Sequence, residues 1–484
     1  MIQRQTARPY NGGMKPRLHP QLPYVLLIAA AFHSITQGIA GDLPDLTELY
    51  RLLHSRPELS GQEEQTAGIV AAELRRVGFD VTEGVGRFSD STQKCHGVVG
   101  VMRNGRGPVV MLRTDLDALP VEERTGLAFA SQVKAKGPAG EVVSVMHACG
   151  HDLHMTVFLG AARELSRNRS QWTGTLVMVG QPAEETGAGA QAMLNDGLYS
   201  RFPKPDYALA LHASADLEAG RIEYCPGYAM AGVDSVDVTI RGRGGHGASP
   251  HRTKDPIVLA AQFVMALQTI VSREVSPLDS AVVTVGSIHG GTKHNIIPDE
   301  VKLQLTVRSY KPEVRERILT SIDRMAKGVA LTGGVGDAAA PSVSYGKEHQ
   351  PPLFNSPALA ERLASVWRRE LGESQVSLAD PVMFAEDFAY FSRDGVAGCL
   401  FWLGAVPKEA WERHKADSAP LPALHSRSWT PDVERAIPTG IRALVSAALE
   451  LFRGAAGSGI SEDQRGPSSL SPSPGRGNVS VPRW

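Results

Sequence analysis

Nine consecutive residues, Met146 to His154, contain three imidazoles, one thiol and one carboxylate. Cys149 and His151 are separated by a single glycine, so both side chains can approach one ion if the backbone bends between them. Gly150 permits such a bend, because a residue without a Cβ adopts φ values that other residues avoid. Thiolate and imidazole are ligands for zinc and its transition-metal neighbours rather than for calcium or magnesium. The run therefore indicates a metal site, although a half-buried loop with a structural thiol would have the same composition.

The remaining composition is that of a globular protein with more than one domain. The chain has 484 residues, of which 42% are apolar and 21% charged, and its net charge is −1. This charge balance gives no reason to expect nucleic acid or an anionic membrane as a partner. The 4 cysteines are scattered without paired spacing, which argues against a disulfide framework.

The two ends of the chain differ from its middle. The first 41 residues contain no Asp or Glu, and basic residues precede an apolar run from Tyr24 to Phe32 that is too short to span a bilayer. Small residues follow as far as Ala40, so residues 1–40 are predicted to be a signal peptide and the protein to be exported, periplasmic or secreted. An uncleaved or disordered N-terminal arm is the alternative, and Met14 would be a more typical start. Residues 454–484 are rich in Gly, Ser and Pro and predict a disordered tail.

Two segments, residues 42–230 and 349–453, have the same pattern of alternating strands and helices. They are expected to form one catalytic domain. In the first, residues 45–82 are expected to form helices, interrupted at Pro57 and with Gly78 where a helix C-cap is expected. Short apolar strands then alternate with helices. Such alternation predicts a mostly parallel sheet covered on both faces by helices. The expected elements are strands at Val98–Met102, Val109–Leu112, Leu176–Val179 and Tyr207–Leu211, and helices at Met155–Ser166 and Ala188–Asp196.

Residues 231–348 have a different pattern. Alternating apolar and polar residues, as in Val301–Arg308, predict half-exposed strands, and two longer helical segments separate them. The order β-α-β-β-α-β is that of a ferredoxin-like unit. Because the pattern of alternating strands and helices returns after this unit, the unit is expected to be an insertion in the catalytic domain.

Polar residues follow three of the expected strands directly. Asp115, the pair Glu184–Glu185 and His212 each come just past a strand, where open α/β sheets bind ligands. Adjacent carboxylates are often only a solvated pair, and a single histidine at such an edge is often only a hydrogen-bonded residue. On a loop, however, two neighbouring side chains point differently, so one can bind metal while the other takes a proton from a metal-activated water.

A nucleotide cofactor is not expected. Gly242, Gly244 and Gly247 fit the G-x-G-x-x-G pattern, but no helix opens behind them and Pro250 interrupts the segment.

These motifs together resemble the aminoacylase–carboxypeptidase superfamily of two-metal amidohydrolases. The branch most similar to this chain contains hippurate hydrolase, bacterial N-acyl-amino-acid amidohydrolases and plant auxin-conjugate hydrolases. The resemblance runs from about His54 to Phe452. It depends on the segments His54–Glu58 with Glu64, Arg113–Pro120, His147–His154, Gln181–Glu185, Gly244–His251 with Asp255–Pro256, His294–Asp299, Glu386–Tyr390 and Leu424–Ser426.

The resemblance implies a zinc-peptidase-like catalytic domain with an inserted dimerisation domain, and a homodimer or higher oligomer. It also implies two divalent ions per subunit, manganese or zinc with cobalt or nickel possible, and Glu184 as the general base. Asp115 would orient a ligand, His246 would reach the partner subunit's active site, and Asn295 and Arg308 would hold the substrate carboxylate. The implied metal ligands are Cys149, His151, Glu185, His212 and His425.

The expected reaction is hydrolysis of the amide bond of N-acyl amino acids, hippurate-like substrates. No nucleic acid partner is expected, and no stable membrane insertion after signal cleavage. A dipeptidase or carboxypeptidase of the same fold, a non-catalytic binding protein on the scaffold and a metal-sequestering protein are the alternatives. The chain departs from the family in three places, which bear on substrate choice more than on metal binding. Arg113 stands where much of the wider superfamily, although generally not this branch, has a metal-binding histidine. The residues after Ser426 lack the proline that relatives usually have, and residues 213–224 match poorly.

Overall fold

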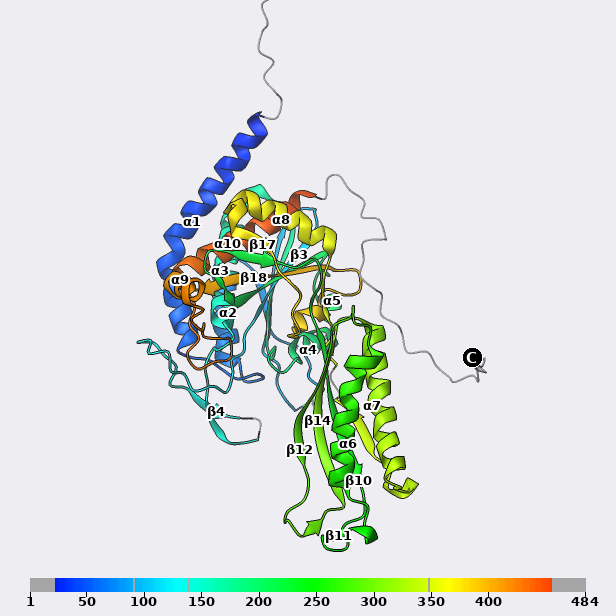
Figure 1. Cartoon of the computed structure of the whole chain (residues 1–484). Coiled ribbons are helices and arrows are strands. Elements are labelled where there is room, and N and C mark those ends of the chain that lie inside the picture. The colour runs from blue at the N-terminus through cyan, green and yellow to red at the C-terminus, as the bar shows by residue number, and fades with distance from the viewer. Residues whose placement is uncertain (1–21, 90–91, 138, 347–348, 455–484) are drawn as a thin grey trace, which may run out of the picture.

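The computed structural model describes residues 22–454, except 90–91, 138 and 347–348. The predicted tail lies outside the described residues beyond its first residue, and so does the first half of the predicted signal peptide. Figure 1 shows two bodies, a larger one built around a broad sheet and a smaller, elongated one that projects from it.

The larger body contains an eight-stranded sheet in the order β1-β2-β6-β3-β7-β18-β8-β17. Its four central strands, β6, β3, β7 and β18, run parallel, whereas β1, β2 and β8 pair antiparallel with their neighbours toward the middle. The predicted mixed, mostly parallel sheet is confirmed. The strands are β1 (Asp80–Val85), β2 (Gly97–Asn104), β3 (Val109–Asp115), β6 (Gly174–Gln181), β7 (Tyr207–Glu218), β8 (Ile222–Tyr224), β17 (Val376–Leu378) and β18 (Ala397–Val406).

Helices cover both faces of this sheet because its strands are apolar on both sides. Val110 and Leu112 pack into one core, and Met111 between them packs into the other, as the two-residue period of a strand requires. The first core is closed by α1 (Leu22–His54), α2 (Glu64–Arg76), α3 (His151–Arg167), α8 (Pro357–Leu371) and α10 (Val433–Arg453). The second is closed by α4 (Gly189–Asn195), α5 (Leu198–Arg201) and the 3₁₀ helix η6 (Asp387–Tyr390), while α9 (Lys408–Asp417) buries none of its residues.

The smaller body follows the expected β-α-β-β-α-β order. Its antiparallel sheet has the strand order β12-β14-β10-β15, and both helices pack on one face of it around a core of its own. The chain leaves the larger body after β9 (Gly227–Met230) and returns at β16 (Leu353–Asn355), and these two short strands pair. The elements are β10 (Gly232–Arg241), α6 (Pro256–Thr269), β12 (Ala281–His289), β14 (Glu300–Ser309), α7 (Pro312–Thr332) and β15 (Ser342–Tyr345).

Two further pairs of short strands project from the bodies. β4 (Lys134–Lys136) and β5 (Val142–Ser144) pair on the larger body, and β11 (Gly245–His246) pairs with β13 (Ile296–Ile297) at the far end of the smaller one (Figure 1). The described chain has one helical stretch, Pro256–Glu274, whose length and composition would suit a membrane span. Its inner residues Leu259, Phe263 and Leu267 pack on the four-stranded sheet instead.

The N-terminal helix bears on the predicted cleavage near Ala40. α1 runs without a break from Leu22 to His54, so that position lies inside a helix. Ile39, which cleavage would remove, is 2% exposed and belongs to the core, and Asp42 beyond it pairs with Arg167. The helix projects from the body toward its N-terminus (Figure 1).

Helix α2 ends beside Gly78, as expected, but the helical range expected up to residue 82 is too long, because residues from Asp80 onward form a strand. α2 stops at Arg76, Gly78 takes a φ of 92°, and the chain then enters strand β1. Glycine at this position ends the helix, because the left-handed conformation cannot continue it. Pairing with β2 then gives the next residues an extended conformation that local helix propensity did not predict.

Candidate metal centre

The turn that presents Cys149 and His151 depends on the glycine between them. Gly150 has a φ of 87° and stands immediately before α3, whose first residue is His151. A Cβ at this position would lie 2.8 Å from the ring of Trp429 and 3.1 Å from Ala213. Both the backbone conformation and the space therefore require glycine, as the sequence indicated.

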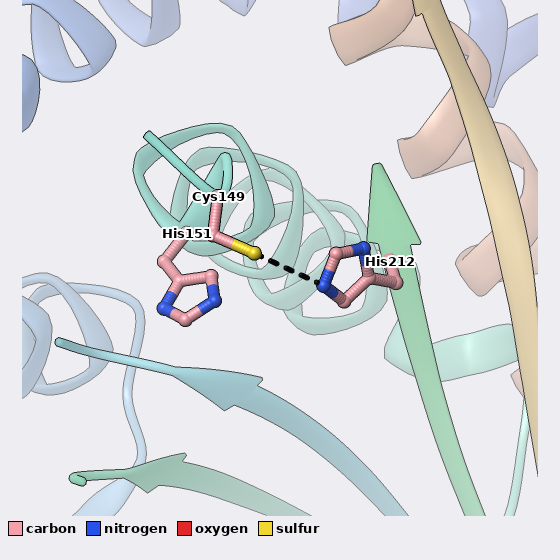
Figure 2. A group of neighbouring side chains, drawn as sticks. All are labelled: Cys149, His151 and His212. Carbon is pink, nitrogen blue, oxygen red and sulfur yellow. Dashed lines mark hydrogen bonds between the residues drawn. The ribbon is translucent and has the colours of Figure 1, made fainter. Parts of the chain in front are cut away.

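Figure 2 shows how Cys149, His151 and His212 gather at the start of α3 and on β7. The Cys149 Sγ lies 3.5 Å from His212 Nε2. The His212 Nδ1 lies 2.8 Å from the carbonyl of Ala213, and the His151 Nδ1 lies 2.8 Å from the carbonyl of Asp117. A carbonyl only accepts hydrogen bonds, so each Nδ1 carries the proton and each Nε2 is free to bind a cation.

His425 and Glu185 complete the set of five predicted ligands. The His425 Nε2 lies 3.2 Å from the Cys149 Sγ and 3.6 Å from Glu185 Oε1, which is itself 3.8 Å from His151 Nε2. His425 has a φ of 63°, uncommon for a residue with a Cβ, and its N–H donates to the carbonyl of Ala148. The structure thus brings all five side chains to one place from four distant parts of the chain.

Two atoms in this cluster indicate that it suits a cation. His151 Nε2 and Glu185 Oε1 are buried, and neither has a hydrogen-bond partner among the described residues. Burial together with Glu185 and Glu184 raises the pKa of the Cys149 thiol well above its ordinary range. A thiolate here therefore needs a positive partner. Sulfur, imidazole and carboxylate donors within 4.8 Å of one another fit a transition-metal ion.

The carboxylates around the cluster also favour a bound cation. Burial opposes protonation of His151, but Asp115 and Asp117 outweigh it and raise its pKa to about 10. Burial, Glu386 and Glu185 raise the pKa of Glu184 well above its ordinary range. Neighbouring carboxylates contribute to both shifts in addition to burial, and bound cations would offset their negative charge.

The predicted role of Asp115, orienting a ligand, stays a prediction. Its Oδ1 lies 2.8 Å from His154 Nδ1, and its Oδ2 accepts from Arg113 at 2.9 Å and lies 3.8 Å from His151 Nε2. The residue that fixes the His151 ring is Asp117, whose importance the sequence reasoning missed. The available signal in the sequence was the position of Asp117, a second carboxylate two residues beyond the end of β3.

A buried network behind the cluster was also missed. Arg113 donates to Gln181, Asp115, Glu386 and Asp387 at 2.8–3.1 Å and is 3% exposed. Carboxylate oxygens of Glu386 and Asp387 gather with one of Glu184 within 4.8 Å. Arg113 therefore lies where it neutralises carboxylates around the predicted base. The adjacent pair Glu386–Asp387 stood in a motif of the sequence, but no predicted strand pointed it toward the cluster.

The other three predicted site residues lie elsewhere. His246 and Asn295 are exposed and lie together at the end of the smaller body where β11 pairs with β13, and the Gly247 N–H donates to the Asn295 carbonyl at 2.9 Å. In this single chain β11 is remote from α3 (Figure 1). Arg308, near the end of β14, donates to the Met383 carbonyl at 2.9 Å, three residues before Glu386.

Comparison with known proteins agrees with this geometry. A family model described as peptidase family M20/M25/M40 matches residues 111–449. An N-acetyl-L-cysteine deacetylase of Bacillus subtilis is 36% identical over 76% of this chain and 82% of its own. The IAA-amino acid hydrolase ILR1-like 2 of Arabidopsis thaliana is 34% identical over 74% and 76% of the two chains. The crystal structure of the YXEP protein of Bacillus subtilis, a dinuclear metal binding peptidase, matches with a TM-score of 0.67 and 27% identity over 85% of this chain and 98% of its own.

Fold and donor set together define a metal-dependent hydrolase that acts on amide bonds. The chain belongs to peptidase family M20/M25/M40, within the amidohydrolase branch that its sequence motifs resemble.

Proposed function

We propose that this protein hydrolyses the amide bond of N-acyl amino acids, with hippurate-like compounds among its substrates. The observation that carries the proposal is the adjacent pair Glu184–Glu185 at the end of β6, with one carboxylate beside His425 and the other beside Glu386. Two relatives at about 35% identity bear the names of a deacetylase and an amino acid conjugate hydrolase.

The five donors would hold two divalent cations, with the Cys149 sulfur between His212 and His425. Such cations, when bound, lower the pKa of a water to about 7 and polarise the amide carbonyl. Manganese and zinc suit the mixed donor set, and cobalt or nickel fit it as well.

Glu184 is the proposed general base. It is 8% exposed, and its Oε2 lies 3.9 Å from His151 Nε2, so it borders the cluster without filling it. The carboxylate accepts a proton from the attacking water and then gives it to the departing amine, which balances the charge of the reaction. The neighbouring Glu386 favours proton acceptance, since a like charge disfavours the ionised form.

His246 is proposed to act in the active site of a partner subunit, where it would stabilise the developing oxyanion. Its exposed position at the β11–β13 end of the smaller body supports this, since no described hydrogen bond or ion pair joins it to a metal donor of its own chain. The outer face of α6 supports dimerisation, because Ile257, Val258 and Met265 are 45–70% exposed on one helix. Arg308 and Asn295 are proposed to bind the substrate carboxylate, for which a guanidinium is suited.

A hydrolysis screen tests the function. N-acetyl, N-benzoyl and long-chain N-acyl amino acids are compared with dipeptides at equal concentration, each with manganese, zinc, cobalt and nickel. We expect kcat/KM for at least one N-acyl amino acid to exceed that for every dipeptide. Preference for dipeptides would make the protein a peptidase of this fold. Binding of substrate without turnover in any metal would make it a binding protein.

We also propose that residues 1–40 direct export. The support is the acid-free, basic start followed by a short apolar run. N-terminal sequencing of the exported protein tests this, with a chain beginning near Gly41 as the expected result. Because cleavage removes the buried Ile39, an intact α1 on the exported protein would favour an uncleaved anchor instead.

A further inference from the structure

We propose that Glu63 is a positioning residue for catalysis: it holds Ala183 in a left-handed backbone conformation, so that the next residue, Glu184, faces the metal cluster. The inference rests on the proposed role of Glu184 as general base. Glu63 is remote from the loop in sequence and touches none of the five metal donors through a hydrogen bond of the described structure.

The contact is direct and buried. Glu63 Oε1 accepts from the Ala183 N–H at 2.8 Å and from the Gly61 N–H at 2.7 Å. Glu63 has no exposed surface and Ala183 is 2% exposed. Hydrogen bonds from backbone amides to a carboxylate are among the stronger ones, and water cannot replace them at a buried position.

Ala183 needs such support because its φ is 52°. A residue with a Cβ is disfavoured in this conformation and persists there only when its surroundings enforce it. The conformation turns the chain sharply after β6 ends at Gln181. As a result the next two carboxylates diverge, Glu184 toward Glu386 and Glu185 toward His425.

The rest of the loop is anchored separately. The Glu185 N–H donates to Asp117 Oδ2 at 3.0 Å, and the carbonyls of Ala183 and Glu184 accept from Gly189 and Gly187 within the loop. Among the described contacts, Glu63 alone holds the Ala183 N–H. Removal of the Glu63 carboxylate is therefore expected to loosen the loop at Ala183 and Glu184. Glu185, the predicted metal ligand, keeps its hydrogen bond to Asp117.

A purely structural role as a helix cap does not account for Glu63. It stands at the N-cap of α2, yet its side chain makes no capping hydrogen bond. The first amides of that helix are capped by Glu58, which accepts from Gln65 and Thr66 at 3.2 and 2.8 Å. The helix therefore has its cap, and the Glu63 carboxylate is directed to the catalytic loop instead.

The test compares Glu63→Ala, Glu63→Gln and the matched control Glu58→Ala in the metal-loaded enzyme. We expect Glu63→Ala to lower kcat roughly 10–100-fold, the cost of a misplaced catalytic group. KM and the amount of bound metal should stay within about twofold of the wild-type values, because the hydrogen bonds that hold the metal donors are unchanged. Glu63→Gln retains an acceptor oxygen and should keep kcat within about threefold, whereas Glu58→Ala should lower the melting temperature and leave kcat unchanged.

A rescue sharpens the test. Glycine adopts a φ of 52° without a steric cost, so Ala183→Gly in the Glu63→Ala background should restore kcat by roughly tenfold. If Glu63→Ala does not fold, Glu63→Asp takes its place, since its shortened carboxylate no longer reaches Ala183.

The proposal is overturned if kcat of Glu63→Ala is unchanged, or if this variant loses bound metal in proportion to its loss of kcat. It is also overturned if adding Ala183→Gly to Glu63→Ala restores no activity. The variant Glu184→Gln distinguishes a failure of the positioning role of Glu63 from a failure of the proposed function. If Glu184→Gln is inactive while Glu63→Ala is fully active, only the positioning role is wrong.

Discussion

The two regions that carry predicted catalytic residues differ in how completely the chain builds them. The metal cluster draws Cys149, His212 and His425 from distant segments into a buried site with sulfur–nitrogen distances of 3.2–3.5 Å. The β11–β13 end of the smaller body leaves His246 and Asn295 exposed. There the His246 ring accepts a local hydrogen bond, from the Ala248 N–H to its Nδ1 at 3.0 Å.

One chain therefore organises the buried cluster by itself, because packing and hydrogen bonds keep its donors arranged without a partner. An exposed imidazole at the β11–β13 end has no such support, so a catalytic role for it would require a second surface that fixes it against a reacting group. We expect substitutions in the two regions to behave differently.

The largest effect is expected at the base. Glu184→Gln keeps the shape of the side chain and removes its ability to accept a proton. We expect turnover to fall by roughly 10²–10⁴ while metal binding survives. Steady-state kinetics and metal analysis on the same preparation measure both. Full activity in this variant would remove Glu184 from the mechanism.

The neighbouring carboxylate should behave differently. Glu185→Gln removes an oxygen that lies between His151 and His425, so metal affinity should fall roughly tenfold or more. Activity should return at high metal concentration. The assignment within the pair is reversed if Glu184→Gln loses metal and Glu185→Gln does not.

The β11–β13 end of the smaller body is tested by mixing two inactive proteins. His246→Ala and Glu184→Gln should each be nearly inactive alone. In a heterodimer, one site carries both defects and the other carries neither. Random exchange at equal amounts makes half of the dimers mixed, so about a quarter of wild-type activity should return. Mixed dimers that form without activity would show that His246 does not act in trans.

A smaller effect is expected on stability beneath the cluster. The buried His54 contacts Asp152 at 2.7 Å and Glu123 at 3.0 Å, and although burial opposes it, these carboxylates raise the His54 pKa to about 10. A pKa above the ordinary 6.5 adds stability that is complete below that pH and is lost as pH rises toward 10. His54→Gln should therefore cost roughly 3 kcal/mol at pH 6, and less as pH approaches 10.

Urea unfolding at pH 6 and pH 9.5 measures this cost. His349→Gln is the control, because His349 pairs with Asp234 at 3.3 Å but is 35% exposed, and its loss should cost less than about 1 kcal/mol at either pH. A cost for His54→Gln that is equal at both pH values would contradict a charged His54.

The same contrast explains what could be predicted from the sequence. Four donors of the cluster stand just past strand ends or beside Gly150, where the pattern made them candidates, and the resemblance implied their role as ligands. His425 was ambiguous without the resemblance, because it lies on a loop after no predicted strand. Glu63, Asp117 and Glu386 act through tertiary contacts to backbone amides or distant side chains, and no local pattern reports such contacts.

The predicted fold class is confirmed, and one element boundary was wrong for a similar reason. Strands with their own apolar period, such as β3 and β6, were found close to their limits. The first residues of β1 fell within the expected helical range, because only its pairing with β2, and not its own residues, makes it extended.

The central claim is that the buried cluster holds two divalent cations on which hydrolysis depends. Activity titration of metal-stripped protein measures this directly, using the best N-acyl amino acid of the screen. We predict no activity without metal and a rise that saturates at about two equivalents of divalent cation per chain. Full hydrolysis by protein shown to contain no divalent metal would contradict the account.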